Sequence, residues 1–327
     1  MAGLRLTALA ERVRGGLGER PRLVALLLLV AVATLGFLAG HRLGGHGSSS
    51  TSTRTVLVNG VLLDYPSAWK RTTGGSQIAG LALAHELTLD PPGDARAGLT
   101  VGSLAAGDPG PLPEGFLAQL SSNPRTDVLS LSEVQAYRYS NMNVAGFNRA
   151  LTAFAIPNSA PGSTVLACYA GAGDSSFVRE CAQVVYAVTR VGQPLGYDLS
   201  PVRAYARSLA AVLASVQKGR VAVAQAAGAR GASADLGGLA ARLAEQFRAA
   251  ASSLQALEAP AAAQAGQSAL LSAARSAGGA YAALSEAFRA RNAAAYTSAH
   301  ARVVQSEAGV NGALRRLALL GYEQAPK

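Results

Sequence analysis

The chain has few of the residues that commonly carry metal, thiol or nucleophile chemistry. Its 327 residues include two cysteines, two methionines and four histidines. His85-Glu86 is not followed by a second histidine four residues after the first, so a zinc-protease motif is absent. No Gly-x-Ser-x-Gly nucleophile elbow occurs, and His41, His46 and His300 do not form a cluster. The sequence therefore predicts no metal, no cofactor and no catalytic residues.

Lysine is also scarce, since the chain has only Lys70, Lys218 and Lys327, and arginine supplies the other basic residues. Together with abundant alanine and glycine, this bias indicates a high-GC bacterium and carries no function. The formal net charge of +10 is uneven. Residues 54–192 hold nine basic and ten acidic residues, whereas residues 193–327 hold fourteen and seven. The middle of the chain is thus neutral and its C-terminal part is basic.

Charge is missing altogether from one long apolar run, Leu23 to Gly40, which follows an arginine-rich leader at residues 1–22. A helix of this length is roughly 27 Å long at about 1.5 Å per residue, close to the thickness of a bilayer's hydrocarbon core. We expect a single transmembrane helix at 23–40, with the leader in the cytoplasm and the rest outside. A cleaved signal peptide is the alternative, but its apolar core is usually shorter and no small-x-small cleavage site fits.

The part beyond the apolar run divides by composition. Residues 41–55 are rich in Gly, Ser and Thr and are predicted to form a flexible tether. Residues 56–191 contain short β-type runs separated by turn residues, and residues 200–322 contain alanine-rich helical periodicity without turns. Residues 192–199 are the predicted hinge between these two domains.

The first domain is predicted to be α+β, an antiparallel sheet with flanking helices. Alternating apolar residues indicate six strands, at 61–65, 79–89, 99–104, 128–138, 147–156 and 164–169. Helical spacing indicates two helices, at 113–120 and 175–188, the first with a proline in its opening turn.

A short motif near the start of this domain and its two cysteines carry a family resemblance: Gly60-x-x-x-Asp64-Tyr65-Pro66-x-x-Trp69, Cys168 and Cys181. They resemble the PsbP-like superfamily, which includes photosystem II extrinsic proteins and secreted actinobacterial lipoproteins of the LpqN type. The resemblance covers residues 56–191 and implies an antiparallel sheet covered by helices. It also implies a binding or assembly factor and transfers no catalytic residues. The lipobox cysteine of the lipoprotein members is missing, and the predicted anchor helix takes its place.

Cys168 and Cys181 flank a turn that could bring a strand back against the following helix. Outside the membrane the compartment permits oxidation, so we expect a disulfide that stabilises the fold by roughly 3 kcal/mol. The alternative is a pair of buried free thiols. Gly171-x-Gly173-x-x-Ser176, in the same turn, lacks the third glycine and the acidic residue of a dinucleotide site.

The C-terminal region is predicted to be an antiparallel four-helix bundle, because apolar residues recur at steps of three and four in four segments of similar length. Breaks lie at 228–232 and at Pro260, and Gly321 is a C-terminal stop. The third break, near Arg291-Asn292, has no glycine or proline, and we expect Asn292 to cap the fourth helix. Without that cap, the last two helices would form one rod of roughly 85 Å.

Arginines of this region invite a nucleic-acid interpretation, which the predicted topology opposes because the domain lies outside the cell. Solvated helix faces are the default for arginines spread over four helices. Local concentration is seen in two pairs only, which we predict as contacts to an anionic lipid or wall polymer: Arg289 and Arg291, Arg315 and Arg316.

Three functions remain open. The favoured one is a non-catalytic, membrane-anchored binding or scaffolding protein on the outer side of the bacterial membrane, with an envelope protein, a lipid or a wall polymer as its partner. A hydrolase or transferase acting on cell-wall material is the second, and it would need a carboxylate pair or an activated nucleophile. The third is the ectodomain of a sensor. The oligomeric state is not predicted.

Overall fold

The structure is a computed structural model that describes residues 52–72, 78–94, 96–104, 110–132, 134–158, 162–171, 174–191, 195–228 and 235–322. The predicted leader, the transmembrane helix at 23–40 and most of the tether lie outside these residues. Among the residues described, no helix has the length and apolar character needed to cross a bilayer. The chain divides after Ser52, and the following account concerns the compact unit that begins at Thr53.

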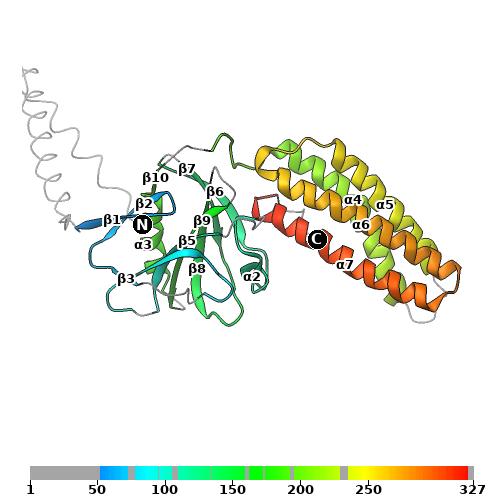
Figure 1. Cartoon of the computed structure of the whole chain (residues 1–327), viewed down its shortest axis with the longest axis horizontal. Coiled ribbons are helices and arrows are strands. Elements are labelled where there is room, and N and C mark those ends of the chain that lie inside the picture. The colour runs from blue at the N-terminus through cyan, green and yellow to red at the C-terminus, as the bar shows by residue number, and fades with distance from the viewer. Residues whose placement is uncertain are drawn as a thin grey trace, which may run out of the picture. The chain divides into compact units, whose positions relative to one another are not determined.

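The larger of two sheets has seven antiparallel strands in the order β3-β4-β5-β9-β8-β7-β6 (Figure 1). Their bounds are β3 Lys70–Thr72, β4 Ala84–Asp90, β5 Gly98–Ser103, β6 Arg125–Leu131, β7 Val134–Ser140, β8 Arg149–Pro157 and β9 Ser163–Gly171. The central strand β9 is buried along its whole length, because both faces of the sheet are covered. The predicted mixture of helices with an antiparallel sheet is thus present.

A smaller sheet has the order β1-β2-β10, with β1 Thr53–Val58, β2 Val61–Pro66 and β10 Thr189–Arg190. Asn59 and Gly60 connect β1 to β2 with φ angles of 50° and 78°, as a two-residue hairpin turn requires. Because β1 begins at Thr53, the last three residues of the predicted tether belong to a strand. Their threonines suit a strand, and Thr55 donates a hydrogen bond to Asp64 of β2.

Several predicted boundaries were wrong. The single strand expected at 128–138 is the β6–β7 hairpin, in which Leu131 is paired with Val134. Both residues are buried, and only Ser132 and Glu133 separate them in the sequence, without a glycine or proline to mark the turn. The first helix is only α2, Glu114–Leu117, and the strand expected from residue 79 begins at Ala84. The second helix, α3 Ser175–Tyr186, starts as predicted and is capped by Asp174, whose side chain accepts from the Phe177 N–H.

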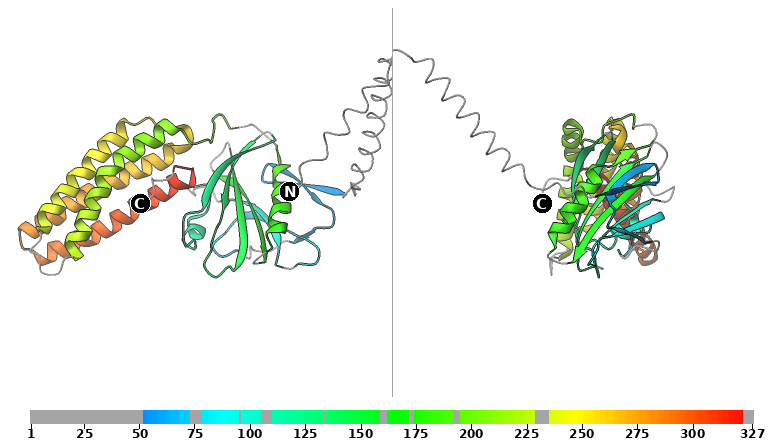
Figure 2. Two further views of the ribbon diagram at one scale, coloured as in Figure 1. Left: turned by 180° about the vertical axis from the view of Figure 1, so that it is seen from behind. Right: turned by 90° about the vertical axis from the view of Figure 1, so that its left-hand side faces the viewer.

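The two faces of the large sheet contribute to separate hydrophobic cores. Figure 2 shows α3 against one face, where Phe154, Leu166 and Cys168 are buried together with residues of α3 and the small sheet. Cys168 and Cys181 are joined by a disulfide with a Cα–Cα distance of 5.9 Å, which confirms the predicted pair. Trp69 packs in this core with its ring 5.4 Å from the Phe177 ring. The opposite face carries Tyr137, Tyr139 and Tyr169, which are buried in the second core.

Four long helices follow: α4 Arg203–Gly228, α5 Leu236–Ala256, α6 Gln264–Arg289 and α7 Ala293–Leu319. They lie in the four predicted segments, and consecutive helices run antiparallel (Figure 1). A short 3-10 helix, η1 Ala261–Ala263, follows Pro260 and leads into α6. Apolar residues at helical spacing, such as Leu243, Phe247 and Leu270, are buried between the helices. We call α4 to α7 the helical region.

Arg291 and Asn292 separate α6 from α7 without a glycine. Arg291 takes the left-handed conformation, with φ of 52°, and the Asn292 N–H donates to the Ala287 carbonyl over 3.2 Å, closing the end of α6. The Asn292 side chain then accepts from the Ala295 N–H at 3.0 Å, which confirms the predicted cap of α7. The last helix ends at Leu319, and the predicted stop Gly321 follows the C-cap Leu320 with φ of 84°.

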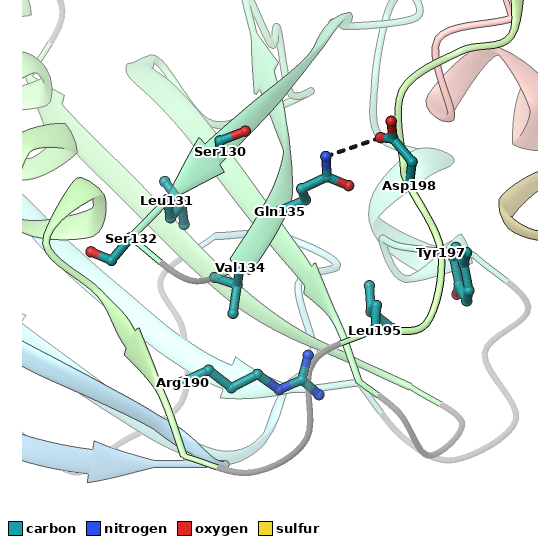
Figure 3. A pocket seen from close by; sticks show the side chains of 9 residues that line it. All are labelled: Ser130, Leu131, Ser132, Val134, Gln135, Arg190, Leu195, Tyr197 and Asp198. Atoms are coloured by element: carbon teal, nitrogen blue, oxygen red, sulfur yellow. Dashed lines mark hydrogen bonds between the residues drawn. The ribbon is translucent and has the colours of Figure 1, made fainter.

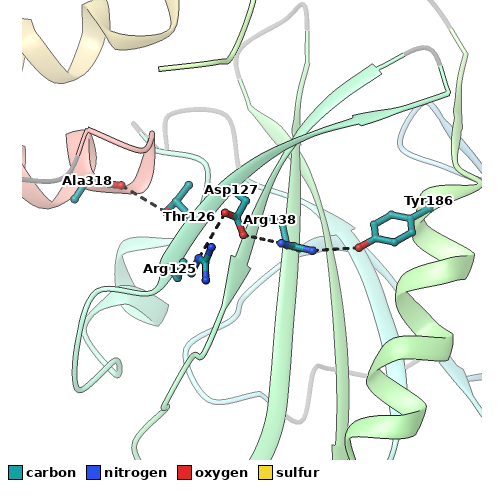
Figure 4. Close-up of polar contacts among 6 residues, drawn as sticks. All are labelled: Arg125, Thr126, Asp127, Arg138, Tyr186 and Ala318. Carbon is teal, nitrogen blue, oxygen red and sulfur yellow. Dashed lines mark hydrogen bonds and ion pairs between the residues drawn. The ribbon is translucent and has the colours of Figure 1, made fainter. Parts of the chain in front are cut away.

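The C-terminal end of α7 packs on the tyrosine-bearing face of the large sheet. The Tyr139 hydroxyl donates to the Leu319 carbonyl at 2.9 Å, and the Thr126 hydroxyl donates to the Ala318 carbonyl at 3.5 Å (Figure 4). Both carbonyls belong to the last turn; the Ala318 carbonyl also accepts from the Gly321 N–H at 2.9 Å, whereas the Leu319 carbonyl accepts from the Tyr139 hydroxyl. A single hydrophobic core includes this sheet face and the interior of the helical region. The two predicted domains are therefore continuous in their packing.

Candidate functional site

A pocket of about 470 Å³ lies beside the turn between β6 and β7. Its walls come from this hairpin, from β10 and from the segment that leads to α4 (Figure 3). The lining residues are Ser130, Leu131, Ser132, Val134, Gln135, Arg190, Leu195, Tyr197 and Asp198.

The apolar part of the pocket consists of four side chains. Leu131 and Val134 are buried members of the core between the sheet and α3, so their positions are fixed by packing. Leu195 is half-buried, and Tyr197 is 41 % exposed at the side of the pocket. This arrangement places a rigid apolar wall on the hairpin side and a more accessible aromatic ring opposite it.

Gln135 and Asp198 fix the pocket wall that is formed by the segment before α4. The Gln135 Nε2 group donates to Asp198 Oδ1 at 2.9 Å, and the Leu199 N–H donates to Gln135 Oε1 at 2.8 Å. The Ser200 N–H also donates to Asp198 Oδ1, at 2.8 Å. Residues 195–199, predicted as part of a hinge, are thus held against β7 by both the nitrogen and the oxygen of the Gln135 side-chain amide.

These hydrogen bonds have an electrostatic consequence for Asp198. Donation from the Ser200 backbone, then from the Ser200 and Gln135 side chains, lowers the pKa of the Asp198 carboxyl below its ordinary value. The carboxylate is therefore ionised at neutral pH and already engaged by donors within the chain.

Arg190 is the cationic group of the pocket. It is half-buried on β10, and its Nη1 group donates to the Pro157 carbonyl at 3.1 Å. Figure 3 shows its side chain extending toward Leu195. Among the described residues, no carboxylate lies within ion-pair distance of Arg190.

A second polar cluster lies on the same hairpin, with Asp127 at its centre. Arg138 donates to Asp127 at 2.7 Å and to the Tyr186 hydroxyl of α3 at 3.3 Å (Figure 4). Arg125 lies 3.6 Å from the same Asp127 carboxylate. The hydrogen bond with Asp127 raises the pKa of Arg138. This cluster ties β6 and β7 to α3, and its one carboxylate is shared by two arginines.

The four arginines predicted from the sequence do not come together. Arg289 and Arg291 lie where α6 meets α7, whereas Arg315 and Arg316 lie near the other end of α7. Helix geometry separates Arg291 from Arg315 by roughly 36 Å at about 1.5 Å per residue. Arg316 forms an ion pair with Glu114 of α2. Contact of these arginines with an anionic surface stays a prediction.

None of the pocket residues was singled out in the sequence. Gln135 and Asp198 are 63 residues apart, so no spacing motif connects them. Arg190 lies at the end of the first predicted domain, just before the predicted hinge at 192–199. Within the described ranges, His, Cys, Asp and Glu side chains form no group of three or more that could hold a metal.

No protein-family model and no curated protein matches the sequence. Among solved structures, the chain is similar to cyanobacterial PsbP (CyanoP) from Synechocystis sp. PCC 6803, with 12 % identity and a TM-score of 0.31 over 44 % of this chain and 95 % of that one. A Bacteroides thetaiotaomicron protein is similar over 67 % of this chain and 74 % of its own, with 12 % identity and a TM-score of 0.27. Both TM-scores are below 0.5, so the α+β architecture rests on the strands and helices themselves.

Proposed function

We propose that this chain is a membrane-anchored, extracytoplasmic binding or scaffolding protein of the bacterial envelope, and that it is not an enzyme. Its α+β domain would be of the PsbP-like, LpqN-related type, with the helix at 23–40 as its anchor. The pocket between the β6–β7 hairpin and the segment at 195–198 is the observation that carries the binding role.

The composition of the pocket favours ligand binding. Small-molecule sites are typically concave and largely apolar, with a few polar groups that fix the orientation of the ligand. Here Leu131 and Val134 supply a fixed apolar wall, and Arg190 supplies a charged group at one side. A ligand in this pocket would touch both the sheet and the segment that leads into α4.

The state of the pocket carboxylate favours binding over acid–base catalysis. A general acid or base works best with a pKa near the operating pH. The hydrogen bonds from Ser200 and Gln135 move the pKa of Asp198 in the opposite direction, below its ordinary value. Asp198 is therefore suited to holding the pocket wall in place.

The disulfide supports an extracytoplasmic location. Structural disulfides form and persist in oxidising compartments and are rare in the cytosol. Cys168 and Cys181 are both fully buried, so the bridge is part of the core between the sheet and α3. This agrees with the orientation predicted from the arginines that precede Leu23.

The binding role is tested by native mass spectrometry of the full chain, extracted in mild detergent from the membranes of its source bacterium. We expect a bound small molecule in the wild type and its loss in Ser132→Trp, which fills the pocket. Ser253→Trp places the same side chain on an exposed position of α5 and should keep the ligand. An unliganded wild type, or a ligand that Ser132→Trp retains, would overturn the proposal. Turnover of cell-wall material by the same preparation would establish the enzymatic alternative instead.

Topology is tested separately in intact cells whose outer layer has been made permeable. Protease should remove the part of the chain that follows residue 41 and spare a tag fused before Met1. Loss of the tag with survival of the rest would reverse the orientation, and a mature chain that begins after residue 40 would show that the anchor is cleaved.

A further inference from the structure

We propose that the pocket beside the β6–β7 turn takes a small molecule with one anionic group, a carboxylate or a phosphate, on an apolar body, and that Arg190 binds the anion. This inference rests on the proposed binding function and gives the chemical class of its ligand. Three observations carry it: the donors of Arg190 that no described residue uses, the hydrogen bonds that already engage Asp198, and the apolar side chains that line the pocket.

The guanidinium of Arg190 is positioned by the fold and only partly used. Its backbone is fixed because Arg190 is paired with Val61 of β2 and the next N–H, of Val191, donates to the Gly60 carbonyl at 2.9 Å. The side chain is half-buried, with Nη1 donating to Pro157. No described residue accepts from Nη2 or Nε, and such paired donors match the geometry of carboxylate and phosphate oxygens.

The acidic residue of the pocket does not neutralise Arg190. Asp198 Oδ1 accepts from the Gln135 amide and from the Ser200 N–H, and no described carboxylate is within ion-pair distance of the guanidinium. Within the described ranges Arg190 is thus a partly desolvated cation without a counter-charge, and such a cation favours an anionic ligand over a neutral one of the same shape.

The remaining walls require more than an inorganic ion. Leu131 and Val134 are buried hydrophobic residues, and the ring of Tyr197 lies across from them (Figure 3). The volume of about 470 Å³ is within the range typical of ligand sites, whereas a water molecule takes roughly 30 Å³. An apolar body would fill this space.

The test uses the full chain in nanodiscs of zwitterionic lipid, with empty nanodiscs as the blank, and equilibrium dialysis of three probes. Phenylacetate and phenyl phosphate carry the two anionic groups, and phenylacetamide is the neutral match. We expect at least one anion to bind ten or more times more tightly than the amide. The stronger of the two anions identifies carboxylate or phosphate as the natural group.

Variants locate the anion. Arg190→Gln should weaken binding of the anionic probe at least tenfold and leave phenylacetamide unchanged, and Arg190→Lys should restore part of the affinity because it keeps the charge. Arg96→Gln removes a mainly exposed arginine outside the pocket and should have no effect. Retention of the disulfide and of the circular-dichroism spectrum shows that each variant is folded.

Equal binding of phenylacetate and phenylacetamide, or unchanged affinity in Arg190→Gln, would overturn the inference. If inorganic phosphate competes as well as phenyl phosphate, the claim that the ligand has an apolar body is wrong. The proposed binding function is refuted by a different result. A neutral ligand that is lost in Ser132→Trp would contradict this inference but support the binding function, whereas the absence of any ligand would contradict the binding function itself.

Discussion

Replacing Glu307 by alanine should destabilise the helical region, because this carboxylate is the shared partner of two other helices. Arg220 of α4 forms an ion pair with Glu307 of α7, with its Nε group 3.3 Å from Oε1. The Tyr281 hydroxyl of α6 donates to the same oxygen at 2.9 Å. The guanidinium also lies 5.5 Å from the ring centre of Phe247, on α5. All four helices therefore meet at this cluster.

The magnitude follows from the burial of the pair. The side chains of Arg220 and Glu307 are 20 % and 21 % exposed, between the fully buried and the surface cases. Breaking a buried pair by removing one partner costs about 3–5 kcal/mol, and an exposed pair contributes about 1 kcal/mol or less. We expect Glu307→Ala to lower the free energy of unfolding by about 2–3 kcal/mol, since the charge of Arg220 and the hydroxyl of Tyr281 both lose their acceptor.

The assay is urea unfolding of the full chain in detergent, followed by circular dichroism at the helical minimum. Glu307→Gln keeps an acceptor oxygen and should give an intermediate loss. The double variant Arg220→Met/Glu307→Leu removes both charges and should be more stable than Glu307→Ala. Glu286→Ala, on the exposed face of α6, is the matched control and should change stability by about 0.5 kcal/mol or less.

Two results would refute this reasoning. A loss below about 0.5 kcal/mol in Glu307→Ala would place the pair in the same class as surface ion pairs. A double variant no more stable than the single one would show that the loss does not come from the unpaired charge of Arg220.

Three further predictions concern local features. Replacing Cys168 and Cys181 by alanine should lower the free energy of unfolding by about 3 kcal/mol, because the bridge closes a loop across 13 positions. Arg291→Gly should raise the free energy of unfolding by about 0.5–1 kcal/mol, since glycine adopts a positive φ without the cost that arginine has there. Arg289→Gly, within α6, should lower the free energy of unfolding. Asp198→Asn should reduce acid sensitivity, because a lowered carboxyl pKa in the folded state contributes stability that is lost as the pH falls through that pKa.

Each of these has a measurement that can contradict it. Unchanged unfolding by urea with and without reductant would show that the bridge contributes little. A melting temperature lower for Arg291→Gly than for the wild type would mean that the arginine side chain contributes more than its conformation costs. If the urea midpoint of Asp198→Asn falls between pH 7 and pH 3 as steeply as that of the wild type, other carboxylates cause the acid sensitivity.

The helices and the disulfide could be predicted because their signals are local. Apolar residues such as Leu243 and Phe247 recur at helical spacing within one segment, whatever the segment packs against. Asparagine is a preferred N-cap residue, so Asn292 predicts the boundary between α6 and α7 from the sequence alone. A sequence with two cysteines allows only one intramolecular pair.

Short strands and the hairpin turn could not be predicted in the same way. β10 has two residues and exists because Thr189 and Arg190 are paired with β2, which is a distant segment. At the β6–β7 turn, two residues that are neither glycine nor proline separate the buried Leu131 from the buried Val134, so the local sequence does not mark the reversal. In these places tertiary pairing decides the structure, and the sequence of the segment itself carries little of that information.

The pocket was missed because its residues become neighbours only when the chain leaving the sheet returns to β7. Gln135 and Asp198 are ordinary polar residues in the sequence, and only their contact makes them a wall. The arginine pairs show the opposite problem. Each looked concentrated in the sequence, but α7 places Arg291 and Arg315 near its opposite ends.

Strand β7 connects the pocket to the helical region. Its alternate residues Gln135, Tyr137 and Tyr139 point to one face, as the period of two in a strand requires. Gln135 holds the pocket wall through Asp198, and Tyr139 holds the end of α7 through the Leu319 carbonyl. At about 3.3 Å per residue these two contacts are roughly 13 Å apart on the same strand. The position of α7 and the shape of the pocket thus depend on one rigid element, which is why ligand binding has to be measured on the full chain.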